Sequence, residues 1–200
     1  MQLMKLAYIA LALGACTDDA VDSTEQARRA YLGLDTSVQK SLQLGFDGFN
    51  MATSANIAPQ MAAGTKTGML TVTGQVDQGN SANKGMRLDV GMVGYTDGPF
   101  LIDTSGHTIT VTYDTSTDMT MQPHLTLSLK GIPTGTLDGT LAGEYNMTGS
   151  LKGTVTLDLT FSGTLMDAGG GKTARVPGNT TVTGTATNAE GGVYMIDLKI

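Results

Sequence analysis

Residues 131–165 read GIPTGTLDGTLAGEYNMTGSLKGTVTLDLTFSGTL, and this stretch decides the fold. Every odd-numbered position holds glycine, proline or an apolar residue, whereas the even-numbered positions are almost all polar. Because side chains alternate between the two faces of a strand, this pattern predicts β structure with one buried face. A single strand of this length would exceed 100 Å at about 3.3 Å per residue, so the chain must fold back at least once.

The unbroken phase of the alternation restricts how the chain can turn. A two-residue hairpin loop pairs residues i and i+3, which would exchange the buried and exposed positions. The pattern therefore predicts odd-length loops or a compensating bulge at a glycine. The candidate glycines are Gly135, Gly139, Gly149 and Gly153.

The same period of two appears in other segments of the chain from Lys66 onward. Polar and apolar residues alternate there, which is typical of half-buried strands. The segments are 70–76, 86–92, 108–113, 125–129 and 194–200. Counting every alternating segment, including those within residues 131–165, the sequence predicts eight strands, or nine if residues 100–103 form one.

A first helix is expected ahead of these strands. Residues 23–26 read Ser-Thr-Glu-Gln, a capping box in which Ser23 caps the third amide and Gln26 reaches back. This signal predicts a helix over roughly 24–32, and Gly33 can end it.

A second helix should follow, with Asp35 as its cap. Its apolar residues recur at four- and three-residue spacing and form one stripe: Val38, Leu42, Phe46 and Phe49. Such a stripe usually packs against a sheet. Residues 50–64 are interpreted as a connector.

The predicted fold class is mainly β, with N-terminal helices (about 24–49) packed on a long-stranded, curved antiparallel sheet or barrel of about eight strands. Residues 23–200 are expected to form a single domain. A transmembrane β-barrel would place threonines in its lumen and the apolar face in lipid. It is disfavoured because aromatic girdles are missing, glycines crowd the supposed lipid face, and the helix stripe would lose its partner.

The N-terminus carries the signature of an exported chain. A short positive start ending at Lys5 is followed by the apolar residues 6–13 and by Gly14-Ala15-Cys16. Residues 13–16, Leu-Gly-Ala-Cys, match all four positions of the lipobox, so the chain resembles bacterial lipoproteins over residues 1–16. The resemblance implies that residues 1–15 are a signal peptide and that Cys16 becomes lipidated.

Residues 16–22 are polar and acidic, and we interpret them as a tether. The expected location is the bacterial cell envelope, held by lipid. We favour the outer membrane over the inner membrane because Thr17, not aspartate, follows Cys16. The formal charge of −6 becomes −7 once Lys5 is removed, which argues against nucleic acid as a partner. With its only cysteine lipidated, the mature chain has no disulfide.

Two short motifs resemble ligand-binding loops but lack residues that those loops require. Gly171-Lys172-Thr173 ends like a phosphate loop, but Met166 stands where that pattern needs glycine and Pro177 opposes the following helix. We therefore expect a hairpin loop over 167–174. Residues 114–118 begin like a calcium loop, yet Met119 and Leu125 replace its glycine and its closing glutamate, so a turn is expected.

The two histidines, His107 and His124, are candidate metal ligands and candidate catalysts. Met119, Met121 and His124 could offer soft ligands to copper, but parity places both methionines on the buried face and His124 opposite, which favours core methionines. Asp103, Ser105 and His107 lie too close together on one strand to converge as a hydrolytic set. A catalytic role would need His107 or His124 within hydrogen-bond reach of a carboxylate in a cleft.

The sequence thus assigns no catalytic, cofactor-binding or metal-binding residue, and Cys16 is its one site residue. The expected function is a membrane-anchored envelope lipoprotein with a non-catalytic structural or binding β domain, in contact with the membrane and with an envelope protein or ligand. The alternative is a carrier or sensor of an apolar ligand held between sheet and helix. A lined cavity of several hundred Å³ would favour the carrier, and a closed, dry core would exclude it.

Overall fold

The computed structural model describes residues 20–169 and 172–200. The helices are α1 (Thr24–Leu32), α2 (Asp35–Met51) and the short 3₁₀ helix η1 (Met119–Met121). The strands are β1 (Asn56–Ala63), β2 (Thr67–Val76), β3 (Lys84–Thr96), β4 (Phe100–Leu101), β5 (Thr108–Ile109), β6 (Val111–Asp114), β7 (His124–Lys130), β8 (Thr136–Gly149), β9 (Gly153–Gly169), β10 (Lys172–Asn188) and β11 (Val193–Lys199). The prediction of a mainly β fold with N-terminal helices is confirmed.

Nine strands form one antiparallel sheet, close to the eight expected. Their order is β1-β2-β3-β6-β8-β9-β10-β11, and β7 pairs with β3 and β8. β4 and β5 form a separate two-stranded sheet. β1 and β11 are the two edges of the large sheet, and within the described part of the chain no pairing joins them.

The turn between β8 and β9 explains the unbroken alternation of residues 131–165. The pairing runs from Thr136 opposite Thr164 to Met147 opposite Gly153. Five residues, 148–152, therefore separate the last paired positions, and an odd number preserves parity. Gly149 and Gly153 take the φ angles of +103° and +91° that favour glycine. The predicted odd-length turn at these two glycines is confirmed.

β6 and β7 share one position in the sheet, between β3 and β8. The chain leaves the sheet after β6, forms η1, and returns as β7. Both ends of this excursion bond to β3: Thr115 donates to the Met92 carbonyl at 3.0 Å, and Val90 donates to the Pro123 carbonyl at 2.9 Å. The excursion is therefore an insertion within one strand.

The two helices begin differently. The Ser23 hydroxyl accepts from the Gln26 amide at 3.3 Å, as predicted, and Gln26 reaches back to the Asp22 amide at 2.9 Å. The prediction that Asp35 caps α2 is wrong: Leu34 holds the cap position, and α2 has no side-chain cap. Asp35 is the first helical residue, and its carboxylate bonds elsewhere.

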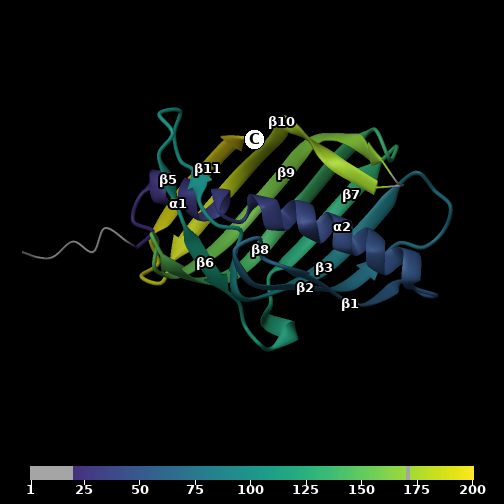
Figure 1. The fold of residues 1–200 in the computed structure, drawn as a ribbon, viewed down its shortest axis with the longest axis horizontal. Coiled ribbons are helices and arrows are strands. Elements are labelled where there is room, and N and C mark those ends of the chain that lie inside the picture. Colours follow the sequence, from purple (N-terminus) through teal and green to yellow (C-terminus); the bar gives the residue numbers. More distant parts are fainter. Residues whose placement is uncertain (1–19, 170–171) are drawn as a thin grey trace, which may run out of the picture.

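The apolar stripe of α2 packs as predicted. Val38, Leu42 and Phe46 are buried, and Phe49 packs at the margin of the core. α2 contacts β1, β2 and β3 on one side and β10 on the other, while α1 contacts β11. Since β1 and β10 lie near opposite edges, the sheet must curl around α2. Figure 1 shows α2 lying across one face, with β1 and β2 on one flank and β10 on the other.

The interpretation of residues 50–64 as a connector is wrong, because β1 occupies most of it. β1 is an edge strand with a register shift between Ile57 and Gln60, and Pro59 lies in that shift. Proline is tolerated there because an edge strand can spare an amide. The alanines of β1 and its register shift also remove the alternation of polar and apolar residues that predicts the other strands.

Candidate functional site

The lipobox cysteine, Cys16, lies outside the described residues, and its lipidation stays a prediction. The tether prediction is likewise largely outside them. Within residues 20–169 and 172–200, no helix is both long and apolar enough to cross a membrane.

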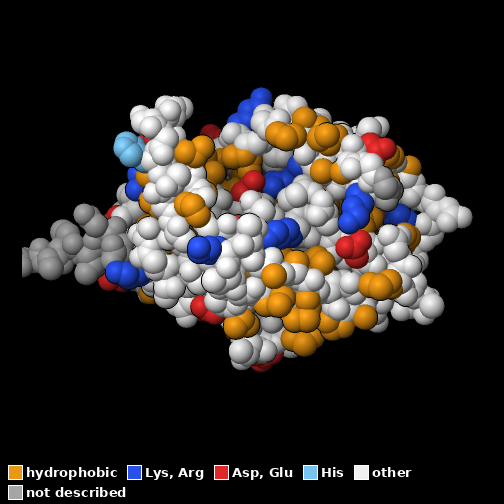
Figure 2. All heavy atoms as spheres, viewed as in Figure 1, with side chains coloured by type: hydrophobic (Ala, Val, Ile, Leu, Met, Phe, Trp, Pro, Cys, Tyr) orange, Lys and Arg blue, Asp and Glu red, His pale blue; other side chains and the backbone are white. Residues whose placement is uncertain are grey.

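A pocket of about 340 Å³ opens between the start of α2 and β10. We call it the rim pocket. Apolar and small residues form much of its wall, and the polar lining comes mainly from α2. The lining residues are Asp35, Thr36, Gln39, Ala174, Arg175, Val176, Pro177, Gly178, Thr180 and Ile200. Figure 2 shows a hollow between the helices and the upper strands in which basic and acidic side chains lie among hydrophobic ones.

A bulge in β10 shapes one wall of the rim pocket. Arg175 pairs with Leu165 and Thr180 pairs with Gly163, so four residues of β10 (176–179) lie opposite one residue of β9. A bulge of this kind bends a strand and redirects its side chains. Here it carries Val176, Pro177 and Gly178 into the pocket wall.

The inner end of the rim pocket is built on Arg175. Its side chain is only 9% exposed, and its guanidinium bonds to Asp35 twice: Nη1 to Oδ1 at 2.8 Å and Nη2 to the main-chain carbonyl at 2.9 Å. The Tyr31 hydroxyl donates to the same Oδ1 at 2.9 Å. Burial opposes the charge of Arg175, but Asp35 outweighs it and raises the pKa of the guanidinium. The contacts between Arg175 and Asp35 hold α2 to β10.

Two nitrogens of this site are buried donors with no hydrogen-bond partner among the described residues: Nε of Arg175 and Nε2 of Gln39. The Gln39 amide is oriented by its oxygen, which accepts from the Arg175 main-chain amide at 3.0 Å. A buried donor without an acceptor costs about 1–3 kcal/mol. Both atoms are covered by other protein atoms and are not exposed in the rim pocket.

A second, wider depression of about 710 Å³ lies on the outer face of the sheet, over β1, β2, β3 and β7. We call it the outer groove. His124 Nδ1 lies 2.5 Å from Asp89 Oδ1. A histidine thus lies within hydrogen-bond reach of a carboxylate in a cleft, which is the arrangement that a catalytic role would need. Strand register, however, places Thr73 opposite Asp89 and Asp89 opposite His124. The carboxylate thus stands between hydroxyl and imidazole, whereas nucleophile activation needs the imidazole in the middle.

The prediction that Met119 and Met121 are core residues is wrong. Both belong to η1 and are 56% and 67% exposed, because the excursion between β6 and β7 takes them off the sheet. Asp118 caps this 3₁₀ turn by accepting from the Thr120 amide at 3.0 Å. Met119 lines the outer groove together with His124. Among the residues that the structure describes, no group of three histidine, cysteine or acidic side chains could hold a metal ion.

The other motifs have structural explanations. Asp114, the last residue of β6, accepts from the Gly94 amide of β3 at 2.7 Å, so the calcium-like segment begins in the sheet and continues into the excursion. The hairpin predicted over 167–174 is present but tighter, since β9 reaches Gly169 and β10 starts at Lys172.

In the exposed loop after β4, Asp103 accepts from the amides of Ser105 and His107 and lies 2.6 Å from His107 Nδ1, which explains this trio as a turn.

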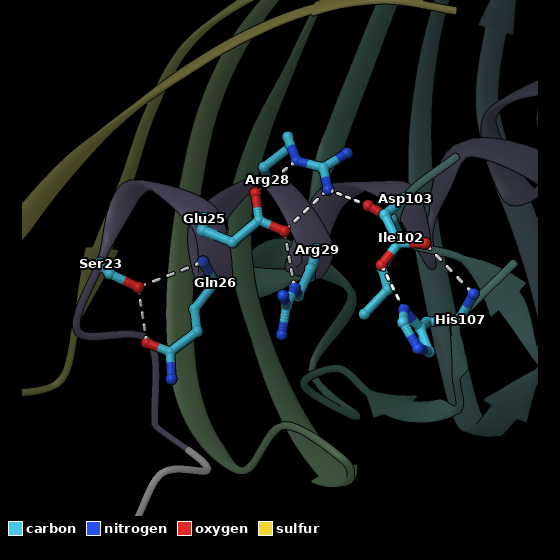
Figure 3. A network of polar contacts seen from close by, with 8 residues as sticks. All are labelled: Ser23, Glu25, Gln26, Arg28, Arg29, Ile102, Asp103 and His107. Carbon is cyan, nitrogen blue, oxygen red and sulfur yellow. Dashed lines mark hydrogen bonds and ion pairs between the residues drawn. The ribbon is translucent and has the colours of Figure 1, made fainter. Parts of the chain in front are cut away.

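That loop is tied to α1 through a charged network, shown in Figure 3. Arg28 bonds to Glu25 at 2.7 Å and to the Ile102 carbonyl, and Arg29 bonds to Glu25 at 2.8 Å. The hydrogen bond from Arg28 is the largest cause that lowers the pKa of Glu25, to about 2. These charges satisfy one another, so we interpret the network as a structural connection between α1 and the loop.

Comparison with protein-family models, with curated proteins and with solved structures finds no match to this chain. The rim pocket was not predicted from the sequence. Its residues lie about 140 positions apart, and the one local signal, Val176-Pro177-Gly178 interrupting a strand, indicates an irregularity but not its partner.

Proposed function

We propose that this chain is a lipid-anchored protein of the bacterial cell envelope, held at the outer membrane through Cys16, whose β domain binds an apolar ligand in the rim pocket. The anchoring part rests on the lipobox at residues 13–16. The binding part rests on one observation: a pocket of about 340 Å³ with largely apolar walls lies between helix and sheet. That volume falls within the range of about 300–1,000 Å³ typical of small-molecule sites.

The position of the rim pocket suits a ligand that enters from the side. The walls come from α2, from the bulge of β10 and from the strand residues beside that bulge, and the bulge residues 176–178 lie outside the continuous ladder of the sheet. A ligand can therefore enter without breaking strand pairing. The buried side chains beneath the rest of α2 continue to hold the fold while the pocket is filled.

The test is the material that co-purifies with the native protein. Solvent extraction followed by mass spectrometry should release an apolar compound at a ratio approaching one per chain. Thr36→Trp fills the pocket from an exposed position on α2, and it should abolish this recovery. Asn50→Trp places the same ring at an exposed position far along the same helix and should leave the recovery unchanged.

Two results would contradict the proposal. A native protein that yields no apolar compound, and that takes up none when incubated with envelope lipid extract, does not carry one. Equal recovery from the native chain and Thr36→Trp would place the ligand elsewhere in the molecule.

A further inference from the structure

One side of the β11 backbone has no partner strand among the described residues. β11 is an edge of the large sheet, and it pairs with β10 in a regular register. Thr180 and Ile200 exchange two main-chain hydrogen bonds, at 2.8 and 2.9 Å. Such bonded pairs alternate along an antiparallel ladder, so the even-numbered residues of β11 direct their amides and carbonyls towards β10. The amides and carbonyls of the odd-numbered residues, Asp197 and Lys199 among them, therefore point away from the sheet.

The opposite edge of the sheet, β1, is protected against further pairing. Pro59 has no amide to donate, and it lies in the register shift between Ile57 and Gln60. β11 contains no proline and no register shift. A second copy of the chain would therefore extend the sheet by pairing its β11 with this β11, and not by pairing its β1. A contact that uses the same surface on both copies has two-fold symmetry and closes as a dimer.

The sequence of β11 is complementary to itself. Residues 196–200 read Ile-Asp-Leu-Lys-Ile, with the two charges placed symmetrically about Leu198. When two such segments pair antiparallel about Leu198, Asp197 of each lies opposite Lys199 of the other. Ile196 and Ile200 meet in the same way, and Leu198 meets its own counterpart. Opposite charges and apolar residues directly across two antiparallel strands both stabilise the pairing.

The backbone and both faces of β11 also fit this pairing. Asp197 and Lys199 direct their amides and carbonyls outwards, so these two residues can exchange main-chain hydrogen bonds with the second copy. Their side chains are exposed, whereas Ile196 is buried and Leu198 and Ile200 are partly buried at the margin of the core. The pairing therefore joins the inner, apolar face of one sheet to the inner face of the other.

We propose that two copies of this chain associate through β11, paired antiparallel about Leu198, and so form one continuous sheet. The charges fix this register. A pairing centred on Asp197 sets two carboxylates against each other, and one centred on Ile196 sets Asp197 opposite Met195. Only the pairing about Leu198 places both charges opposite their counterions. The association does not depend on the ligand proposed for the rim pocket.

The test is the oligomeric state of the full chain in detergent solution, measured by sedimentation velocity. Few residues pair, so the dimer should be weak and is sought at protein concentrations up to about 1 mM. Asp197→Lys and Lys199→Asp each set like charges against each other, and each should weaken association at least about tenfold. Asp158→Lys makes the same charge change at an exposed position on β9, inside the sheet, and should leave association unchanged.

Mixing the two charge variants tests the register itself. Each variant offers the charge that the other lacks, so an equimolar mixture of Asp197→Lys and Lys199→Asp should dimerise as the native chain does. Thermal melts of each variant establish that the fold is retained. A native chain that stays monomeric over the whole range overturns the proposal. So does a dimer that survives both substitutions, and so does a mixture of folded variants that stays monomeric.

Discussion

The hydroxyl of Tyr113 on β6 donates a hydrogen bond to the main-chain carbonyl of Ala30 in α1, with 2.8 Å between the two oxygens. Both residues are fully buried. The same hydroxyl lies where a side chain of Gly33 would begin: a Cβ built on Gly33 would be 2.2 Å from it. The junction between the two helices is thus seated directly on the sheet, and a glycine makes this approach sterically possible.

Tyr113→Phe should destabilise the protein by about 1–3 kcal/mol, because it leaves the buried Ala30 carbonyl without this donor. The measurement is the free energy of unfolding in urea. Tyr194→Phe is the control: Tyr194 is only partly buried at the margin of the core, and its change should stay within about 0.5 kcal/mol. Equal effects of the two substitutions would contradict the importance of this bond.

Gly33→Ala should destabilise more than helix propensity would suggest, because its methyl group would overlap the Tyr113 oxygen and lies 2.8 Å from a ring carbon of Phe100. Removing the oxygen relieves part of that overlap. The double variant Gly33→Ala/Tyr113→Phe should therefore cost less than the sum of the single changes, which a double-mutant cycle measures. Strict additivity would mean that the two groups do not interact.

The stability of the fold should depend on pH through the ionisation of Asp97. Burial raises the pKa of this carboxylate, but hydrogen bonds from Lys40, Tyr95 and Thr65 outweigh that effect and lower the pKa below its usual value. The Lys40 ammonium lies 2.5 Å from Asp97 Oδ1 and connects α2 to the end of β3. Because the pKa of Asp97 is lower in the folded protein, its ionised carboxylate stabilises the fold at pH values above the unfolded-state pKa of about 3.9. This contribution is lost as the pH falls through the folded-state pKa.

Asp97→Asn should accordingly lower the melting temperature at neutral pH, and its difference from the native protein should shrink as the pH falls below about 4. Melting curves recorded across this range are the measurement. Asp138→Asn, at an exposed position on β8, should follow the native profile throughout. A difference for Asp97→Asn that stays constant with pH would show that its ionisation is not linked to folding.

Cys16→Ser should release the protein from membranes, since it removes the predicted site of lipid attachment. Fractionation with a carbonate wash, followed by immunoblotting, distinguishes the two states. The native chain should stay in the membrane fraction, because two or more acyl chains bind membranes firmly. A Cys16→Ser protein that still resists the wash would disprove the assignment of residues 13–16 as a lipobox.

Local patterns were enough to predict the parts of this fold in which every residue obeys one period. The odd positions of β8 and β9 and the stripe of α2 are such cases. Prediction failed where the alternation of polar and apolar residues is interrupted. Pro59 interrupts it in β1, so this strand was not predicted. The excursion that begins after Asp114 places Met119 outside the core. The rim pocket could not be predicted at all. It depends on the meeting of Gln39 and Arg175, which are distant in the chain and joined only by the curl of the sheet.

The five-residue turn at 148–152 also limits how this protein can change during evolution. Deleting or adding one residue there would shift β9 by one position against β8 and point Leu157, Leu159 and Phe161 towards solvent. Changes of two residues would leave the inside and outside of the sheet intact. Among descendants of this chain, the turn should therefore vary in length by even numbers, and single-residue insertions or deletions should be eliminated by selection.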